Sequence, residues 1–292
     1  MSIYGVTAAS GKLGSQVVRA MKSLVGSDRV VGLARTPTKA TSLGVEIRPG
    51  DYELVPELEE SLRGIKGLLL VSGMDAPEKR IGQHRNVIHA AKCVGVKRIV
   101  YTSIQGHEEG NAFSPIVQSN RETERDVRES GLEWVIGRNG IYIEPDTEYI
   151  ESYKENGEIA NCAGSGKCGY TTRDELANAY AKMLTEDSHV GNTYNLHGEA
   201  ITQTQLASYL NVAFGTKLQY RSISVAAFRE DRIAALGEFL GTVIAGIYEG
   251  IRDGAVDNVS HYRAAAGREH YDWQSYFASL PSGLSSTSRK RK

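Results

Sequence analysis

The stretch that decides the fold is Ile3-Tyr4-Gly5-Val6-Thr7-Ala8-Ala9-Ser10-Gly11-Lys12-Leu13-Gly14. Residues 3–7 are typical of a short buried strand. The apolar residues that follow recur on one side of a helix, at Leu13, Val17, Val18 and Met21. Between strand and helix lies a turn with the spacing small-x-x-Gly-x-x-Gly, in which Ala8 takes the first glycine position.

This turn predicts a binding site for an anion. Backbone N–H groups at a helix N-terminus have no partner within the helix, and the helix dipole adds partial positive charge there. Gly11 allows a pyrophosphate to approach the backbone, and Gly14 allows helix and strand to pack closely. A glycine-rich turn that binds nothing is the alternative.

Strand and helix patterns alternate through the first half of the chain. Strands are expected at residues 30–34, 45–48, 67–72, 97–102 and 132–136, and helices at 54–62, 81–94 and 115–127. Alternation with short connections predicts an α/β fold with a doubly wound, Rossmann-type parallel sheet. Ligands bind to such sheets at the carboxyl ends of the strands.

The alternation loosens beyond residue 140. Strands are expected at 157–159, 192–196 and 217–222, and helices from residue 172, over 202–214 and over 226–252. We therefore expect a Rossmann domain over residues 1–140, which later strands can join, and a smaller C-terminal α/β substrate lobe over residues 141–284 that covers the cofactor face. Residues 285–292 end in four basic residues and are expected to be a disordered tail.

Composition argues against several classes of protein. The 292 residues carry a formal net charge of −1, which gives no global attraction to nucleic acid or to an anionic membrane. No apolar run is long enough to span a membrane and no signal peptide is apparent, so we expect a cytoplasmic protein. The three cysteines, Cys93, Cys162 and Cys168, lack a Cys-x-x-Cys spacing, which argues against disulfides and against a metal site. The expected partner is a small molecule, and the expected state is a monomer or homodimer.

Residues after the second and third strands indicate which dinucleotide binds. A protein that binds NAD normally places an acid after the second strand, where it accepts hydrogen bonds from the ribose. Here Arg35 lies 21 residues after Gly14, and Lys39 adds a second positive charge. A guanidinium fork suits a 2′-phosphate, so NADPH is favoured over NADH. Asp51 and Tyr52 are placed to flank the adenine, although Tyr52 fits edge packing equally well.

The helix expected over residues 115–127 indicates the kind of acceptor. Many reductases of this architecture carry Tyr-x-x-x-Lys there as a proton donor and its supporting cation, but this helix has neither Tyr nor Lys. Ketone reduction needs an acid to protonate a strongly basic alkoxide. A quinone becomes a stabilised aromatic oxyanion that water can protonate, so its reduction needs mainly close apposition and a dry site.

The chain resembles the NmrA-like group of atypical short-chain dehydrogenases/reductases, and within it the bacterial NADPH-dependent quinone oxidoreductases and triphenylmethane reductases. The matching segments are residues 6–14, 34–40, 50–52, 68–72, 83–88, 90–92, 101–103, 138–142, 164–167 and 172–174. They follow one another in order from residue 3 to about residue 220. Ala8, in place of the first glycine, departs from the family pattern, as do Gln118 and Asn120, where dye-reducing relatives are richer in histidine.

The resemblance implies a cofactor site, an acceptor site and an activity. Together with the residues already argued, the cofactor site would comprise Thr7, Ala9, Ser10, Gly11, Lys12, Leu13, Arg35, Lys39, Asp51, Tyr52, Ser72, Gly73, Thr102 and Ser103. Asn139 and Tyr142 would contact the acceptor. The expected activity is NADPH-dependent transfer of hydride to a quinone or a similar electron-poor acceptor. The alternative is a regulator that senses NADP(H) without turnover, as some NmrA-like proteins do; an apolar cleft beside the nicotinamide would favour the enzyme.

Overall fold

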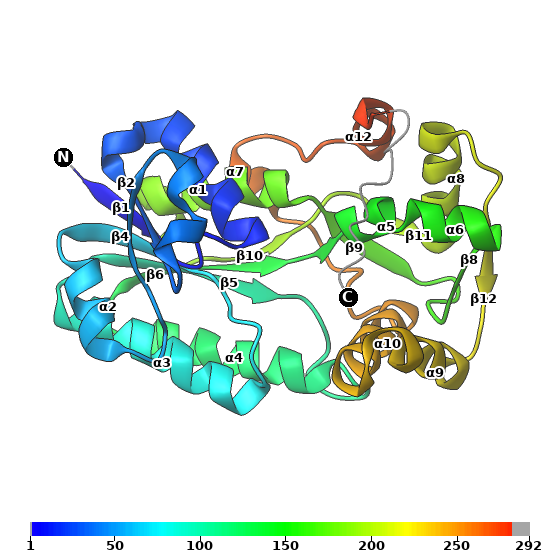
Figure 1. Ribbon diagram of the computed structural model, residues 1–292, viewed down its shortest axis with the longest axis horizontal. Helices are drawn as coiled ribbons and strands as arrows, with labels where there is room; N and C mark the ends of the chain where they lie inside the picture. The colour runs from blue at the N-terminus through cyan, green and yellow to red at the C-terminus, as the bar shows by residue number, and fades with distance from the viewer. Residues whose placement is uncertain (1, 282–292) are drawn as a thin grey trace.

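A computed structural model describes residues 2–281 (Figure 1), so the tail expected at 285–292 lies outside the described residues. Its centre is a seven-stranded sheet with the order β10-β6-β5-β4-β1-β2-β3, in which all paired strands are parallel. The strands are β1 (Ile3–Val6), β2 (Val30–Ala34), β3 (Glu46–Pro49), β4 (Ile65–Leu70), β5 (Arg98–Ile104), β6 (Glu133–Asn139) and β10 (Thr193–Leu196). The order reverses between β1 and β4, and this places the expected ligand crevice at their carboxyl ends.

Helices cover both faces of this sheet (Figure 1). One face carries α1 (Lys12–Val25), α7 (Arg173–Thr185) and α11 (Tyr262–Ala266), and the other carries α2 (Val55–Leu62), α3 (Pro77–Cys93) and α4 (Ser114–Glu129). The apolar stripe expected on α1 is buried, with Val17, Val18 and Met21 fully inaccessible. The doubly wound Rossmann-type sheet expected from the alternation is thereby confirmed.

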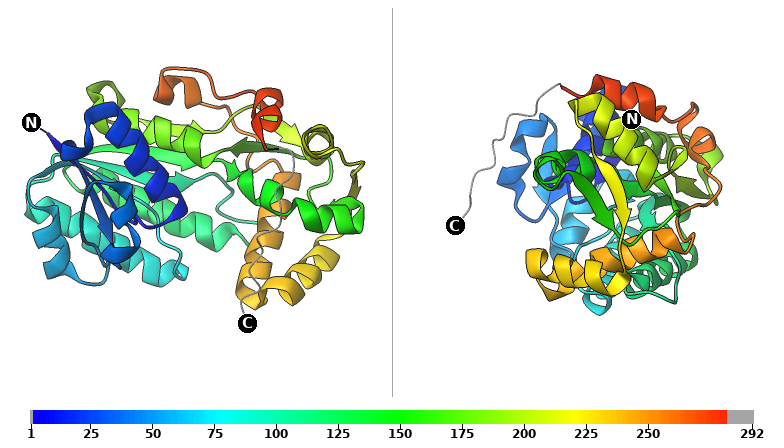
Figure 2. Two further views of the ribbon diagram at one scale, coloured as in Figure 1. Left: turned by 45° about the horizontal axis from the view of Figure 1, so that its top comes forward. Right: turned by 90° about the vertical axis from the view of Figure 1, so that its right-hand side faces the viewer.

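The remaining elements gather beyond the carboxyl end of the sheet (Figure 2). The strands there are β7 (Ile141–Tyr142), β8 (Glu158–Asn161), β9 (Lys167–Thr171), β11 (Ala200–Thr202) and β12 (Gln219–Ser222). The helices are α5 (Glu144–Glu148), α6 (Ile150–Asn156), α8 (Gln203–Phe214), α9 (Val225–Leu236), α10 (Glu238–Arg252) and α12 (Trp273–Ser279). We call this group the second lobe. The chain enters and leaves it more than once, because α7, β10 and α11 pack with the central sheet.

Two local features of the second lobe differ from the expected pattern. The largely helical stretch expected over residues 226–252 is helical but divided in two, because Gly237 between α9 and α10 has φ +83°, a conformation that interrupts a right-handed helix. No strand was expected over residues 167–171, but β9 lies there and pairs with both β7 and β11. By contrast, the helix expected over residues 202–214 is present as α8, and it begins with a capping box in which Thr202 and Gln205 are bonded reciprocally.

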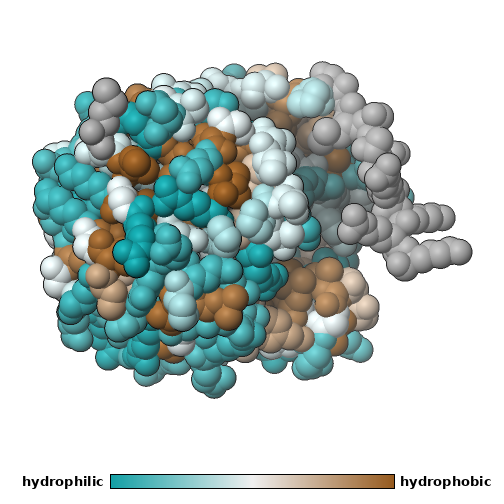
Figure 3. All heavy atoms as spheres, turned by 60° about the vertical axis from the view of Figure 1, so that its left-hand side comes forward, coloured by the Kyte–Doolittle hydropathy of each residue, from teal (hydrophilic) through white to brown (hydrophobic). Residues whose placement is uncertain are grey.

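The surface shown in Figure 3 is mostly hydrophilic, with small hydrophobic groups separated by polar side chains. Such a distribution is typical of a surface that faces water. Within residues 2–281, no helix has both the length and the apolar character needed to cross a bilayer.

The β1–α1 turn depends on close contact between backbone atoms. Ala8 has φ +48°, the only positive φ of a residue other than glycine among the described residues. This conformation turns the Ala8 carbonyl toward α1, where a Cβ on Gly14 would lie 2.3 Å from the Ala8 oxygen. Only glycine therefore fits at position 14 without moving the turn.

Replacing Gly14 by alanine should destabilise the protein by about 1–3 kcal/mol, because the new methyl group overlaps backbone that has no room to move. The matched control is Gly82→Ala on α3, where an added Cβ meets nothing within 4 Å and the residue is exposed. That change should stabilise the protein by up to about 1 kcal/mol, since alanine is the better helix former. Chemical denaturation measures the change in the free energy of unfolding of each variant. Equal changes in the two variants would contradict the packing argument.

Candidate functional site

The turn between β1 and α1 presents free backbone donors at the carboxyl edge of the sheet. Helix α1 has Gly11 as its N-cap, with no capping side chain and no acid in its first turn. Ser10, Gly11 and Lys12 are exposed, so an anion can reach this helix end. Ala9 and Leu13 are buried instead, and the Ala9 amide donates to the carbonyl of Leu33 in β2.

Lys12 joins this turn to the second lobe. Its ammonium lies 3.1 Å from the carboxylate of Glu148 on α5, and both side chains are more than half exposed. An exposed pair of this kind is worth little energy, on the order of 0–1 kcal/mol. A phosphate bound at the turn would therefore compete with Glu148 for Lys12 at small cost.

Thr7 and Tyr52 hold the ends of β1 and β4 together rather than facing solvent. The Thr7 hydroxyl oxygen accepts a hydrogen bond from the Val71 amide at 2.9 Å. The Tyr52 hydroxyl bonds to Thr7 Oγ1, and its distance to the Val71 carbonyl is 2.8 Å. Burial raises the pKa of Tyr52 well above its usual range, so this hydroxyl stays protonated. Of the two interpretations weighed for Tyr52, the contacts of its hydroxyl match packing at the sheet edge.

Arg35 and Lys39, beyond β2, are both exposed. Within residues 2–281 neither side chain forms an ion pair or a hydrogen bond, whereas nearby Lys79 is paired with Glu53 at 2.6 Å. Asp51 accepts a hydrogen bond from the Glu53 amide and shapes the loop after β3. The two cations are therefore the groups at this end of the crevice that are available to a phosphate.

Ser72 and Gly73 lie in the segment after β4, and a hydrogen bond to α3 fixes the position of this segment. The Gly73 amide donates to Nε2 of His84 at 3.0 Å, while Nδ1 of the same ring lies 2.9 Å from Thr123 Oγ1. Burial lowers the pKa of His84 to about 3, so the ring is neutral at physiological pH. The ring is fully buried. Its role is to position this segment.

Thr102 and Ser103, at the end of β5, are buried. Thr102 accepts a hydrogen bond from the Ser72 amide at 2.8 Å, and Ser103 donates to the carboxylate of Glu124 at 2.7 Å. Glu124 is fully buried and also accepts hydrogen bonds from three guanidinium groups, those of Arg121, Arg128 and Arg138. Burial raises the pKa of Glu124, but these bonds outweigh it and hold the pKa below its usual value.

Asn139 and Tyr142 lie where the chain leaves the sheet and enters the second lobe. Asn139 Oδ1 accepts a hydrogen bond from the Tyr180 hydroxyl at 2.6 Å, and its Nδ2 donates to the Tyr142 oxygen at 3.3 Å. The guanidinium of Arg173 stacks on the Tyr142 ring, 5.4 Å from its centre. Burial raises the pKa of Tyr142 to about 12. Asn139 thus orients Tyr142, whose hydroxyl keeps its proton at neutral pH.

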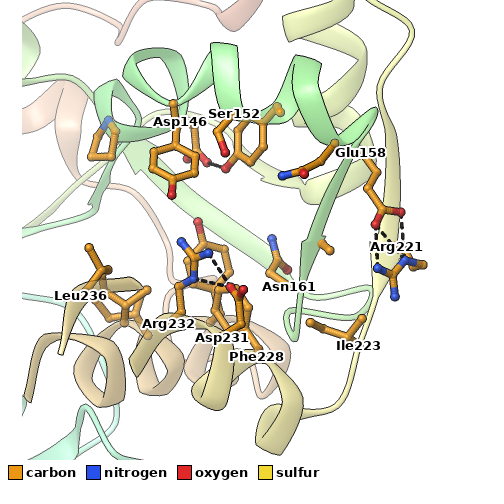
Figure 4. Close-up of a pocket in the computed structure, with 18 of the residues that line it drawn as sticks. Asp146, Ser152, Glu158, Asn161, Arg221, Ile223, Phe228, Asp231, Arg232 and Leu236 are labelled. Carbon is orange, nitrogen blue, oxygen red and sulfur yellow. Dashed lines mark hydrogen bonds and ion pairs between the residues drawn. The ribbon is translucent and has the colours of Figure 1, made fainter. Parts of the chain in front are cut away.

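A cavity of about 570 Å³ begins at Tyr142 and extends into the second lobe (Figure 4). Helices α5 and α6 form one wall and α9 and α10 the other. Four aromatic residues line it besides Tyr142, namely Tyr149, Tyr153, Phe228 and Tyr248. It reaches solvent beside Tyr149 and Leu236, which are 41% and 40% exposed. Polar and charged side chains line it as well, among them Asp146, Asn161 and Arg232. Aromatic walls combined with placed polar groups are typical of sites for small molecules.

One carboxylic acid in this cavity was not found from the sequence. Asp146 on α5 is 4% exposed, and its Oδ1 accepts a hydrogen bond from the Tyr153 hydroxyl at 2.8 Å. Burial raises the pKa of Asp146 from 3.8 to about 6, although hydrogen bonds from tyrosine hydroxyls oppose the rise. A lone aspartate on a five-residue helix carries no sequence signal, because its burial depends on β9 and α10.

None of the three cysteines lines the cavity. Cys162 and Cys168 are buried, and burial raises the pKa of both thiols, which fits two ordinary thiols rather than a redox pair. Cys93 is exposed on α3, where its sulfur comes within 4.8 Å of side-chain atoms of Glu59 and His89. That group lies on α2 and α3, and none of its members lines the cavity.

Comparison with known proteins identifies the family. Residues 8–187 match the family model described as NAD(P)H-binding. Quinone oxidoreductase 2 of Escherichia coli is 36% identical over 230 residues, which is 77% of this chain and 79% of that protein. The crystal structure of the E. coli NADPH-dependent quinone oxidoreductase complexed with NADPH superimposes with a TM-score of 0.87 at 31% identity, over 94% of this chain and 99% of that one.

Two further relatives carry the same resemblance. An NmrA-like family domain-containing oxidoreductase of Aspergillus flavus is 28% identical over 83% of each protein. The triphenylmethane reductase of Citrobacter sp., solved with NADP(H), is 30% identical with a TM-score of 0.87, over 96% of this chain and 100% of that one. On these grounds the chain belongs to the NAD(P)H-binding, NmrA-like family of atypical short-chain dehydrogenases/reductases.

Proposed function

We propose that the protein is an NADPH-dependent oxidoreductase that transfers hydride to a quinone or a similar electron-poor aromatic acceptor. The main support for this proposal is that an anion-binding end and an aromatic cavity occur along the same edge of the sheet. Along the carboxyl edge of the sheet, one end has an exposed helix N-terminus and two cations, Arg35 and Lys39, that have no ion pair within residues 2–281. At the other end a cavity lined by aromatic side chains begins at Tyr142. The relatives named above are oxidoreductases, and the two solved structures are complexed with NADPH or NADP(H), which supports the same conclusion.

The residues present fit NADPH better than NADH. The first turn of α1 offers backbone N–H groups to the pyrophosphate, and Lys12 is held only by an exposed ion pair. Arg35 and Lys39 are free to bind the 2′-phosphate, and residues 33–39, where an NAD-binding protein would carry an acid, contain none. The bound cofactor would supply the hydride, and the protein binds the cofactor, orients it and excludes water from the site.

The acceptor would occupy the cavity beyond Tyr142. Asn139 fixes the Tyr142 hydroxyl from behind, so that the ring forms a rigid wall at the entrance of the cavity. The alternative, a regulator without turnover, is not favoured, because the relatives named above are oxidoreductases and because a cavity of about 570 Å³ extends from Tyr142, a residue expected to contact the acceptor. A monomer or homodimer in the cytoplasm, with no nucleic-acid partner, remains our prediction.

Purified protein should oxidise NADPH when menadione is added, and should do so far more slowly with NADH at equal concentration. The physical reason is that only NADPH carries the phosphate that Arg35 and Lys39 attract. Loss of the reduced-nicotinamide absorbance measures the rate, and boiled protein corrects for direct reaction. Tight NADP⁺ binding without turnover, over a panel of quinones of different size, would favour the regulator instead.

The charge reversal Arg35→Glu should weaken NADPH binding about 10- to 100-fold and leave NADH binding nearly unchanged. A hydrogen bond to a charged group is worth about 1.5–3 kcal/mol, and the new carboxylate also repels the phosphate. Arg19→Glu is the matched control, because Arg19 is an exposed arginine on α1 whose side chain contacts only Gln16 among the described residues. Calorimetric titration gives both dissociation constants, and equal losses for the two dinucleotides would show that Arg35 does not reach the 2′-phosphate.

A further inference from the structure

The acceptor cavity contains one buried carboxylic acid, that of Asp146, which has no positively charged partner among the described residues. Asp146 lines the cavity wall from α5, and it forms no ion pair with any described residue. Its visible partner is Tyr153 of α6, whose hydroxyl donates to Oδ1 at 2.8 Å (Figure 4). A buried carboxyl without a cation prefers its neutral, protonated form.

Every other titratable group that faces Asp146 keeps its proton near neutral pH. These groups are Tyr153 of α6, Cys168 and Tyr170 of β9, and Tyr248 of α10. Burial raises the pKa of each of them well above its usual value. The guanidinium of Arg232, which also lines the cavity, is paired with Asp231 instead (Figure 4). Asp146 is therefore the one group of this cluster that gains and loses a proton between pH 5 and 7.

We propose that Asp146 is the proton donor of the acceptor site, and that Tyr153 is its positioning residue. This inference rests on the proposed function, since it requires that the acceptor be reduced in this cavity. It also names an acid for a protonation that water would otherwise perform, because the helix over residues 114–129 has no tyrosine and no lysine, and a cavity closed by the acceptor admits little water. The acid comes instead from α5 of the second lobe.

The acceptor would gain one hydride, which is a proton together with two electrons, from the reduced nicotinamide, and an acceptor oxygen would then carry the negative charge. The O–H bond of the Asp146 carboxyl then breaks, and a new O–H bond forms on the acceptor oxygen. The products are the hydroquinone, NADP⁺ and an Asp146 carboxylate, which the Tyr153 hydroxyl stabilises through Oδ1. Solvent entering beside Tyr149 and Leu236 returns the proton after product release.

The pH dependence has a definite sign. The pKa of Asp146 in the folded chain is about 6, so the donor is protonated below this pH and ionised above it. Turnover of menadione at saturating NADPH should therefore fall as pH rises through about 6, by about tenfold per pH unit once the carboxyl is ionised. Asp146→Asn should lower kcat about a hundredfold at pH 5.5, remove this inflection, and leave the dissociation constant of NADPH unchanged.

Two further variants separate proton donation from a structural effect. The Tyr153 hydrogen bond lowers the pKa of Asp146, so Tyr153→Phe should move the inflection to higher pH without abolishing it. Glu151→Gln, an exposed residue on α6 that pairs with Lys154 outside the cavity, should change neither kcat nor the inflection. A purely structural role for the pair would lower activity at all pH values and leave the inflection where it is.

Thermal unfolding gives a readout that does not depend on activity. Because folding raises the pKa of Asp146 from 3.8, the folded state holds this proton more tightly, and stability falls as pH rises from about 4 to about 6. Asp146→Asn should therefore melt at a higher temperature than the unchanged protein at pH 7.5, and at the same temperature at pH 4.

The outcomes distinguish the two proposals. If the unchanged protein reduces no quinone at any pH, the proposed function fails. If it reduces menadione but Asp146→Asn keeps the same pH profile and the same kcat, the proposed function stands and the assignment of Asp146 is overturned.

Discussion

The contact of Gly14 with the Ala8 carbonyl is the constraint on which the rest of the site depends. It lets the first turn of α1 lie directly against the end of β1, so that unpaired N–H groups point along the carboxyl edge of the sheet. The neighbouring strand ends are joined to β1 by side-chain hydrogen bonds through Thr7. The crevice is therefore rigid where it meets phosphate, and its more open part lies at the other end, in the second lobe.

The residues proposed for the site fall into two groups with different physical roles. Ser10, Gly11, Lys12, Arg35 and Lys39 are exposed and are available to bind the cofactor. The side chains of Thr7, Tyr52, Thr102 and Ser103 are occupied by hydrogen bonds within the chain, which set the shape of the crevice. Family resemblance places both groups near the cofactor, but it does not say which side chains face inward.

The second lobe supplies what the central sheet lacks. The sheet and its turns can hold a dinucleotide, but the walls around an acceptor come from α5, α6, α9 and α10. Helix α10 also contacts the sheet half of the molecule, because its Gly246 lies against the backbone of Phe113 just before α4. Packing of this kind encloses an aromatic cavity in which a carboxyl group is kept from water, and it turns an ordinary aspartate into a weak acid suited to neutral pH.

The amino-acid sequence alone was enough to predict the strand and helix alternation, the phosphate turn, and the cations beyond β2. These features are local, because periodicity, glycine spacing and the offset of Arg35 are all read within a few dozen residues. The cavity, the buried state of His84, the inward hydroxyl of Tyr52 and the raised pKa of Asp146 were decided only by the tertiary structure. Each of them depends on side chains brought together from distant segments, and burial, not sequence spacing, sets their chemistry.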